Sequence, residues 1–130
     1  MKRTIIIISL FLLMIGFSVG ELIIHRHIYT RIHNDLLIVN MQMDEAEGNL
    51  SDSTAMQTMN NTMAFWNRRK TILTSVSNSN IIRIVDEHLT RLHGHLEQNM
   101  YDFAKVQLAV TTTYLEDLIK ELNPVPGNIL

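Results

Sequence analysis

The first 24 residues constrain the fold more than any other part of the chain. After Lys2 and Arg3, the run from Thr4 to Ile24 is mostly apolar, and Glu21 is its only charged residue. At about 1.5 Å per residue, such a helix is roughly 31 Å long, the thickness of a bilayer hydrocarbon core. Glu21 lies near the end of the run, where its carboxylate can reach the headgroup region. Residues 1–24 are therefore predicted to form a membrane anchor.

A cleaved signal peptide is the alternative interpretation. The segment Ile5–Phe17 has the length of a signal-peptide apolar core, and the small residues at Ser18 and Gly20 fit a cleavage site directly after Gly20. Two features favour the uncleaved anchor. Apolar residues resume after Glu21, and the helical pattern continues into Ile28 with no glycine or proline between them. We expect the anchor and the first exported helix to form one rod.

The flanking charges predict the orientation. Lys2 and Arg3 precede the apolar run, which favours a cytoplasmic N-terminus and an extracytoplasmic location for everything from residue 25 onward. The cell membrane is the expected location. The other flank is basic as well, so the charge difference across the span is small. We expect that flank at the membrane interface, together with Glu21; it contains His25, Arg26 and His27.

The length and composition of the remaining chain predict one domain and exclude several kinds of functional site. About 105 residues is the size of a single compact unit. The balance of 11 basic and 13 acidic residues gives no nucleic-acid footprint, and the absence of cysteine excludes disulfides and thiolate chemistry. No nucleophile or phosphate-binding motif is present, so we expect no enzyme activity and no cofactor.

Glycine and proline usage predicts an all-α domain. Between Glu21 and Asn123 there is no proline, and Gly48 and Gly94 are the only glycines. Four apolar stripes with helical spacing are separated by short polar segments. The stripes are Ile28, Ile32, Leu36, Val39, Met43 and Ala46; Met56, Met59, Met63, Trp66, Leu73 and Val76; Ile81, Val85, Leu89, Leu92 and Leu96; and Ala104, Leu108, Thr111, Leu115, Leu118 and Leu122.

This pattern predicts an antiparallel bundle of about four helices over residues 25–123. Gly48 is expected to end the first helix, and one of Ser51, Asp52 and Ser53 to cap the second. Ser77 to Asn80 is expected to be a loop, and the third helix to stop near Gln98-Asn99. Residues 124–130 form a C-terminal extension, whose final Ile129-Leu130 is expected to dock on the bundle.

The densest basic cluster after the anchor adjoins the single tryptophan. Arg68, Arg69 and Lys70 follow Trp66, and such a patch can contact an anionic wall polymer or phospholipid. The alternative is a core tryptophan with a solvated charged flank. Histidines give no metal site, because His88 and His95 are seven residues apart, whereas helical metal pairs prefer a spacing of four.

Four features of the chain suggest a relationship to other proteins: the anchor, Trp66, the segment Ile81–Leu89 and the terminal Asn128-Ile129-Leu130. In these features the chain resembles the bacterial domain of unknown function 4363 family. The resemblance implies a small membrane-anchored helical protein of Gram-positive, often spore-forming bacteria, and it implies no catalytic residue. One departure is the Ser77 to Asn80 loop, where the family has an Asn-His-like pair and an acidic residue.

We therefore expect an extracytoplasmic structural or protein-interaction module, with another membrane or exported protein as its partner. A sensor-like bundle that binds a small ligand and acts through a membrane partner is the alternative. Apolar positions outside the main stripes, such as Phe65, Ile72 and Phe103, either complete the core or close a homo-oligomer.

Overall fold

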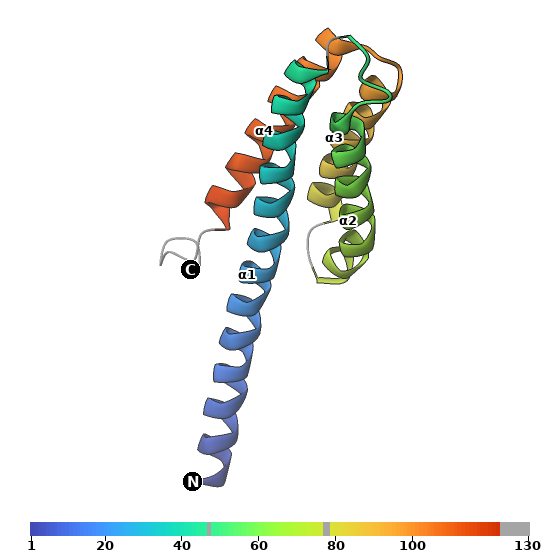
Figure 1. Cartoon of the computed structure of the whole chain (residues 1–130). Helices are drawn as coiled ribbons and strands as arrows, with labels where there is room; N and C mark the ends of the chain where they lie inside the picture. Colours follow the sequence, from blue (N-terminus) through green and yellow to red (C-terminus); the bar gives the residue numbers. More distant parts are fainter. Residues whose placement is uncertain (47, 77–78, 123–130) are drawn as a thin grey trace.

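The described part of the chain forms four α-helices arranged as a bundle on a long stalk (Figure 1). The structure, a computed structural model, describes residues 1–46, 48–76 and 79–122. The helices are α1 (Lys2–Glu45), α2 (Thr54–Val76), α3 (Ser79–Glu97) and α4 (Tyr101–Glu121), and the described residues form no strand. Each helix packs on the next one, and α4 closes on α1, so all neighbours are antiparallel. The predicted all-α bundle is confirmed.

Helix α1 has two parts with different surroundings. In its N-terminal part, a window with mean hydropathy 2.4 has none of its residues buried, although the helix there is long and apolar enough to cross a membrane. A signal sequence near an N-terminus has the same properties. From His25 onward, one face of the same helix is buried against α2 and α4. The predicted continuous rod is confirmed, and its free half projects from the bundle (Figure 1).

The core contains most residues of the predicted stripes, with additions from residues just beside them. Ala46, Met63, Ile81 and Leu122 are only partly buried, and the predicted burial of Val76 lies outside what the structure describes. Trp66 is fully buried, and Tyr29 packs its ring against the indole at a centroid separation of 6.4 Å. Phe65 is also buried and completes the core, while Ile72 and Phe103 stay largely exposed. On α3, Ile82 is more deeply buried than the expected Ile81. The core therefore follows the 3.6-residue pattern, with its edges set by how each helix is rotated.

The end of the bundle farthest from the chain's N-terminus is fastened by two short connections. Gly48 has a positive φ of 93°, and the Ser53 hydroxyl caps α2 by accepting a hydrogen bond from the Met56 amide at 3.4 Å. Asn99 has a φ of 57° and ends α3, where Met100 N donates to His95 O and Asn99 N to Leu96 O. This is the hydrogen-bond pattern of a Schellman motif. The predicted boundaries near Gly48, Ser53 and Asn99 are confirmed.

Two predicted boundaries lie only partly within the described residues. Ser79 and Asn80 belong to the first turn of α3, so the loop between α2 and α3 is shorter than expected. Helix α4 ends at Glu121, close to the expected stop. Asn123, the extension 124–130 and the docking of Ile129-Leu130 lie outside the described residues.

Two threonines on α4 lie in the helix interface. Thr111 and Thr112 are buried, and their hydroxyls donate to the carbonyls of Gln107 and Leu108 at 2.6 and 2.9 Å. Because these hydroxyls are satisfied within their own helix, small β-branched side chains fit the core without an unpaired polar atom.

Candidate membrane-proximal interface

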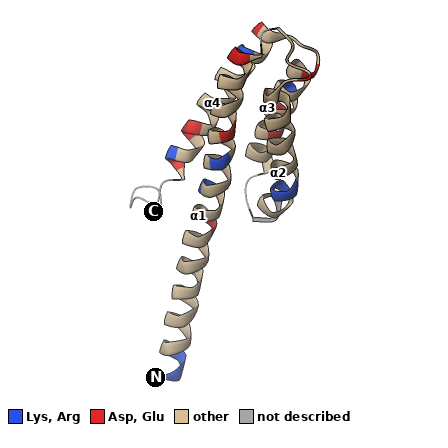
Figure 2. Cartoon of the chain, in the orientation of Figure 1, with Lys and Arg blue, Asp and Glu red and all other residues tan. Residues whose placement is uncertain are grey.

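Basic side chains gather at the end of the bundle from which the free half of α1 emerges. Of the 11 Lys and Arg residues in the chain, Lys2 and Arg3 precede the apolar run, and seven of the other nine lie in this region. They come from the middle of α1, the last third of α2, the start of α3 and the end of α4 (Figure 2). We call this set the basic collar: Arg26, Arg31, Arg68, Arg69, Lys70, Arg83 and Lys120.

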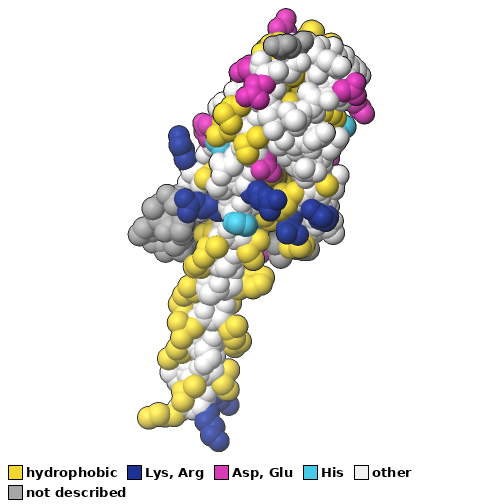
Figure 3. All heavy atoms as spheres, viewed as in Figure 1, with side chains coloured by type: hydrophobic (Ala, Val, Ile, Leu, Met, Phe, Trp, Pro, Cys, Tyr) yellow, Lys and Arg dark blue, Asp and Glu magenta, His cyan; other side chains and the backbone are white. Residues whose placement is uncertain are grey.

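The opposite end of the bundle is acidic. Figure 3 shows dark blue side chains around the lower part of the bundle, directly above the yellow shaft, and magenta side chains mainly above them. Glu21, Asp86, Glu87 and Glu121 lie among the collar residues, and Asp35, Glu116 and Asp117 lie within one helical turn of them. The described acidic residues farther toward the opposite end are Asp44, Glu45, Asp52, Glu97 and Asp102. Only Arg91 and Lys105 are basic there, and Lys105 pairs with Asp44 at 2.6 Å. The bundle therefore has a basic end next to the free half of α1 and an acidic end opposite it.

The structure separates the four residues of the predicted Trp66 cluster. Trp66 Nε1 donates to Asp86 Oδ1 at 2.9 Å, and Lys70 Nζ binds the same oxygen at 3.0 Å. Trp66 is thus a core residue that helps to join α2 to α3, and it offers no exposed ring to a partner. Lys70 is partly neutralised by Asp86. Arg68 and Arg69 remain on the exposed surface.

Phe65 holds two collar arginines in place. The guanidinium carbon of Arg31 lies 4.3 Å from the Phe65 ring centroid, and that of Arg69 lies 5.0 Å from it. Cation–π contact fixes a guanidinium over a ring while leaving its N–H groups at the rim for other acceptors. The two arginines come from different helices, so this contact also stabilises the α1–α2 pair. Sequence spacing did not reveal it.

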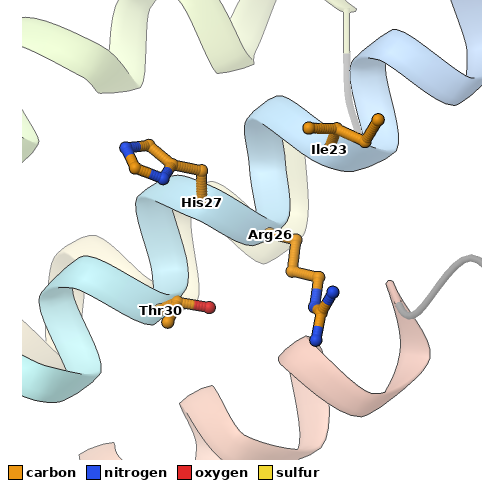
Figure 4. Close-up of a pocket in the computed structure, with 4 residues that line it drawn as sticks. All are labelled: Ile23, Arg26, His27 and Thr30. Carbon is orange, nitrogen blue, oxygen red and sulfur yellow. The ribbon is translucent and has the colours of Figure 1, made fainter.

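A shallow hollow on α1 lies where the apolar run ends. Its volume is about 290 Å³, and Figure 4 shows the four side chains that line it, Ile23, Arg26, His27 and Thr30. Arg26 and His27 are exposed, and Glu21, one turn earlier, is half-buried. The hollow therefore combines an apolar side chain with a guanidinium, an imidazole and a hydroxyl. The structure brings Arg26 and His27, both predicted at the membrane interface, to this one site.

His25 occupies a different position from its two neighbours. Its side chain is turned into the bundle and is 7% exposed, beside a cavity of about 60 Å³ lined by Tyr29, Ile81, Leu118, Glu121 and Leu122. Burial lowers the pKa of His25, and the charge of Glu21 opposes this shift only in part. A neutral, buried imidazole is poorly suited to the headgroup contact that was expected of it. Its prediction as an interface residue stays untested.

Helix α4 carries an exposed apolar stripe that the sequence reasoning did not single out as a site. Phe103, Val106 and Val110 are 60%, 66% and 46% exposed. His95 stacks on Phe103 at a centroid distance of 5.8 Å, and a hollow of about 300 Å³ is lined by both of them and by Val106. The spacing of three and four residues, outside the core stripe, is the signal in the sequence that marks this second face.

The described residues show no cluster that could hold a metal ion. Within residues 1–46, 48–76 and 79–122, no three His, Asp or Glu side chains gather in a geometry that can hold a metal. No buried side-chain nitrogen or oxygen there lacks a hydrogen-bond partner. His88 accepts a hydrogen bond from Gln107 at 2.9 Å and packs on Tyr114, as a structural histidine does.

Comparisons with protein-family models, with curated proteins and with solved structures found no match to this chain. The resemblance to the domain of unknown function 4363 family therefore stays a prediction. The function has to be argued from the geometry of the collar, the α4 stripe and the apolar half of α1.

Proposed function

We propose that this protein is a membrane-anchored, extracytoplasmic helical bundle that serves as a structural or protein-interaction module. The observation that carries this proposal is the contrast along α1: an apolar half that the bundle leaves uncovered, followed without a break by a half that supplies the bundle core. An uncovered apolar helix of this length is stable in a bilayer and costly in water. We retain the family resemblance as part of this proposal.

The orientation in this proposal rests on the charges that flank the span. Lys2 and Arg3 stand side by side directly before Thr4, whereas Arg26 and Arg31 are spread over the first seven positions after Ile24. The concentration of positive charge immediately before the span favours a cytoplasmic N-terminus and a bundle outside the cell membrane. The unbroken helix supports retention of the anchor rather than cleavage after Gly20, because no extended segment is available there for a peptidase.

The α4 stripe supports an interaction role. Phe103, Val106 and Val110 form an apolar face on a bundle whose core is already closed, and such faces mark protein contacts. A sensor role has less support. The cavity between the helices beside His25 has a volume of about 60 Å³, well below the several hundred Å³ typical of small-molecule sites, and the larger hollows, of about 290 to 460 Å³, are open to the surface. The partner of the stripe is proposed to be another membrane or exported protein, or a second copy of this chain.

Site-specific crosslinking tests the interaction role. Because the chain contains no cysteine, Val106→Cys carries a single benzophenone label in cells that make the full chain. We expect one discrete crosslinked product from Val106→Cys. The matched control is Asn67→Cys, an exposed position on α2. Equal patterns from the two positions, or no product at Val106, would contradict the proposal.

A further inference from the structure

We propose that the basic collar binds the phosphate groups of anionic phospholipids in the leaflet on the bundle's side of the membrane. The inference rests on the proposed anchoring of α1, and it adds a ligand and a site to that role. It does not depend on the direction in which the chain crosses the membrane. It is carried by the position, the charge and the shape of the collar.

Position is fixed by the unbroken helix. Ile24 is still exposed at the end of the apolar run, and Arg26 follows two residues later on the same helix. At about 1.5 Å per residue, Arg26 and Arg31 lie roughly 3–10 Å beyond the end of the run, which is the depth of the headgroup layer. Phe65 of α2 contacts Arg31 of α1, and Glu116 of α4 contacts His33 of α1, so the collar residues of α2 and α4 lie at a level similar to those of α1.

The charge of the collar is only partly neutralised within the protein. Lys70 pairs with Asp86, and Arg83 pairs with Glu87 at 2.7 Å. None of the acidic residues in the described part of the chain forms an ion pair with the remaining collar arginines, which are Arg26, Arg31, Arg68 and Arg69. Phe65 contacts the guanidinium groups of two of them, Arg31 and Arg69, and the side chains of all four are exposed. Four cationic forks therefore remain for acceptors outside the bundle, and phosphate oxygens suit them.

The hollow on α1 favours a lipid over a soluble anion. Arg26, His27 and Thr30 supply donors, and Ile23 lies on the membrane side of them, next to the apolar run. A glycerophospholipid has the same order of groups, a phosphate followed by acyl chains. A free phosphate or a wall polymer gains nothing from Ile23. The acidic far end of the bundle is repelled by an anionic surface, so the collar is the face that such a surface selects.

Lipid selectivity of the full chain tests this inference. The protein is reconstituted in liposomes with spin-labelled phosphatidylglycerol or phosphatidylcholine, and electron paramagnetic resonance gives the association of each lipid with the protein. We expect phosphatidylglycerol to be preferred by about two- to fivefold at low salt, since one juxtamembrane arginine contributes up to about fivefold. The preference should fall toward one in about 1 M NaCl, where the Debye length is about 3 Å.

Variants assign the preference to the collar. The double variant Arg26→Gln, Arg68→Gln should lose most of the preference for phosphatidylglycerol. Both side chains are exposed and lie outside the core, so we expect the variant to fold. The matched charge-preserving variant, R26K/R68K, should retain most of it. Arg91→Gln removes one exposed positive charge away from the collar and should leave it unchanged. Circular dichroism of each variant checks that the helices are intact.

Several results would overturn the inference. Equal association of the two lipids with a fully inserted protein would do so, as would an equal loss of preference in R91Q. If inorganic phosphate or a soluble glycerol phosphate polymer abolishes the preference at matched ionic strength, the collar binds soluble phosphate and the lipid assignment is wrong. A protein that restricts neither lipid is not inserted, and this result would instead contradict the proposed anchoring.

Discussion

At the scale of single residues, several side chains have roles that differ from those their types suggest. Trp66 lies among cations in the sequence, yet its indole is buried and its N–H is bound by Asp86. The Asp86 carboxylate also accepts a hydrogen bond from Lys70, so it binds two of the four residues in the predicted Trp66 cluster. The truly exposed cations are Arg68 and Arg69. Residue type alone therefore identifies the cluster but not which of its members are available for binding.

His88 makes the stability of the bundle dependent on pH. Burial lowers its pKa from 6.5, the nearby Arg91 lowers it further, and Glu87 opposes the shift. The unfolded chain thus binds a proton at His88 before the folded chain does. The contribution of neutral His88 to the free energy of unfolding should be fully present above about pH 6.5. It should be lost as the pH falls from there through the lower pKa of His88 in the folded state. Protonation also removes the Nδ1 acceptor that Gln107 uses.

Replacing His88 by Asn tests this effect, because the Asn side-chain oxygen occupies the place of Nδ1 but does not titrate. We expect the fall in Tm between pH 7.5 and pH 5 to be smaller for H88N than for the unaltered full chain, measured in the same detergent. His25, whose pKa is also lowered by burial, is present in both proteins. A fall of the same size in both would show that His88 contributes nothing.

At the scale of the helices, Asn99 is the residue that fastens the two connections at the far end of the bundle. Its side-chain oxygen accepts from the amide of the fully buried Leu50, and its amide group donates to Gly48 O, both at 2.8 Å. Its positive φ of 57° closes α3. One side chain therefore links the α1–α2 connection to the α3–α4 connection.

Substitutions at Asn99 should separate its two roles. Asn99→Gly keeps the left-handed backbone but removes both hydrogen bonds, at a cost of about 1–2 kcal/mol. Asn99→Ala removes the same bonds and adds left-handed strain, for a total of about 2–4 kcal/mol. Chemical denaturation of the full chain should rank the unaltered protein above N99G, and N99G above N99A. Equal stability of the two variants would show that the backbone conformation costs nothing.

The helices themselves follow from the sequence, because burial repeats along each one with the period of a helix. Ile32, Leu36 and Val39 were predicted on one face and are fully buried. The collar could be predicted only in part. The burial of His25 and the stacking of Arg31 on Phe65 depend on how neighbouring helices are rotated against each other. That rotation is set by packing between helices, which no single stripe encodes.

At the scale of the whole molecule, the protein is a rod with three zones. The free half of α1 is apolar and uncovered, the collar above it is basic, and the far end of the bundle is acidic (Figures 1 and 3). Each zone suits a different surrounding: hydrocarbon, anionic headgroups and water. The α4 stripe is an exposed apolar face of the bundle that suits a protein partner, and Leu37, Ile38 and Met41 of α1 are exposed as well. We propose that the function depends on where the bundle is held and on which molecules contact its faces.

The proposed role requires that α1 spans the membrane intact and holds the bundle outside the cell. A single cysteine at exposed Ser51 reports on this directly, because the chain has no other cysteine. In intact cells, a membrane-impermeant maleimide should label Ser51→Cys, while a cysteine inserted after Met1 should react only after permeabilisation. The labelled protein should have the mass of the full chain. Protection of Ser51→Cys in intact cells, or a product shortened at Gly20, would contradict the claim.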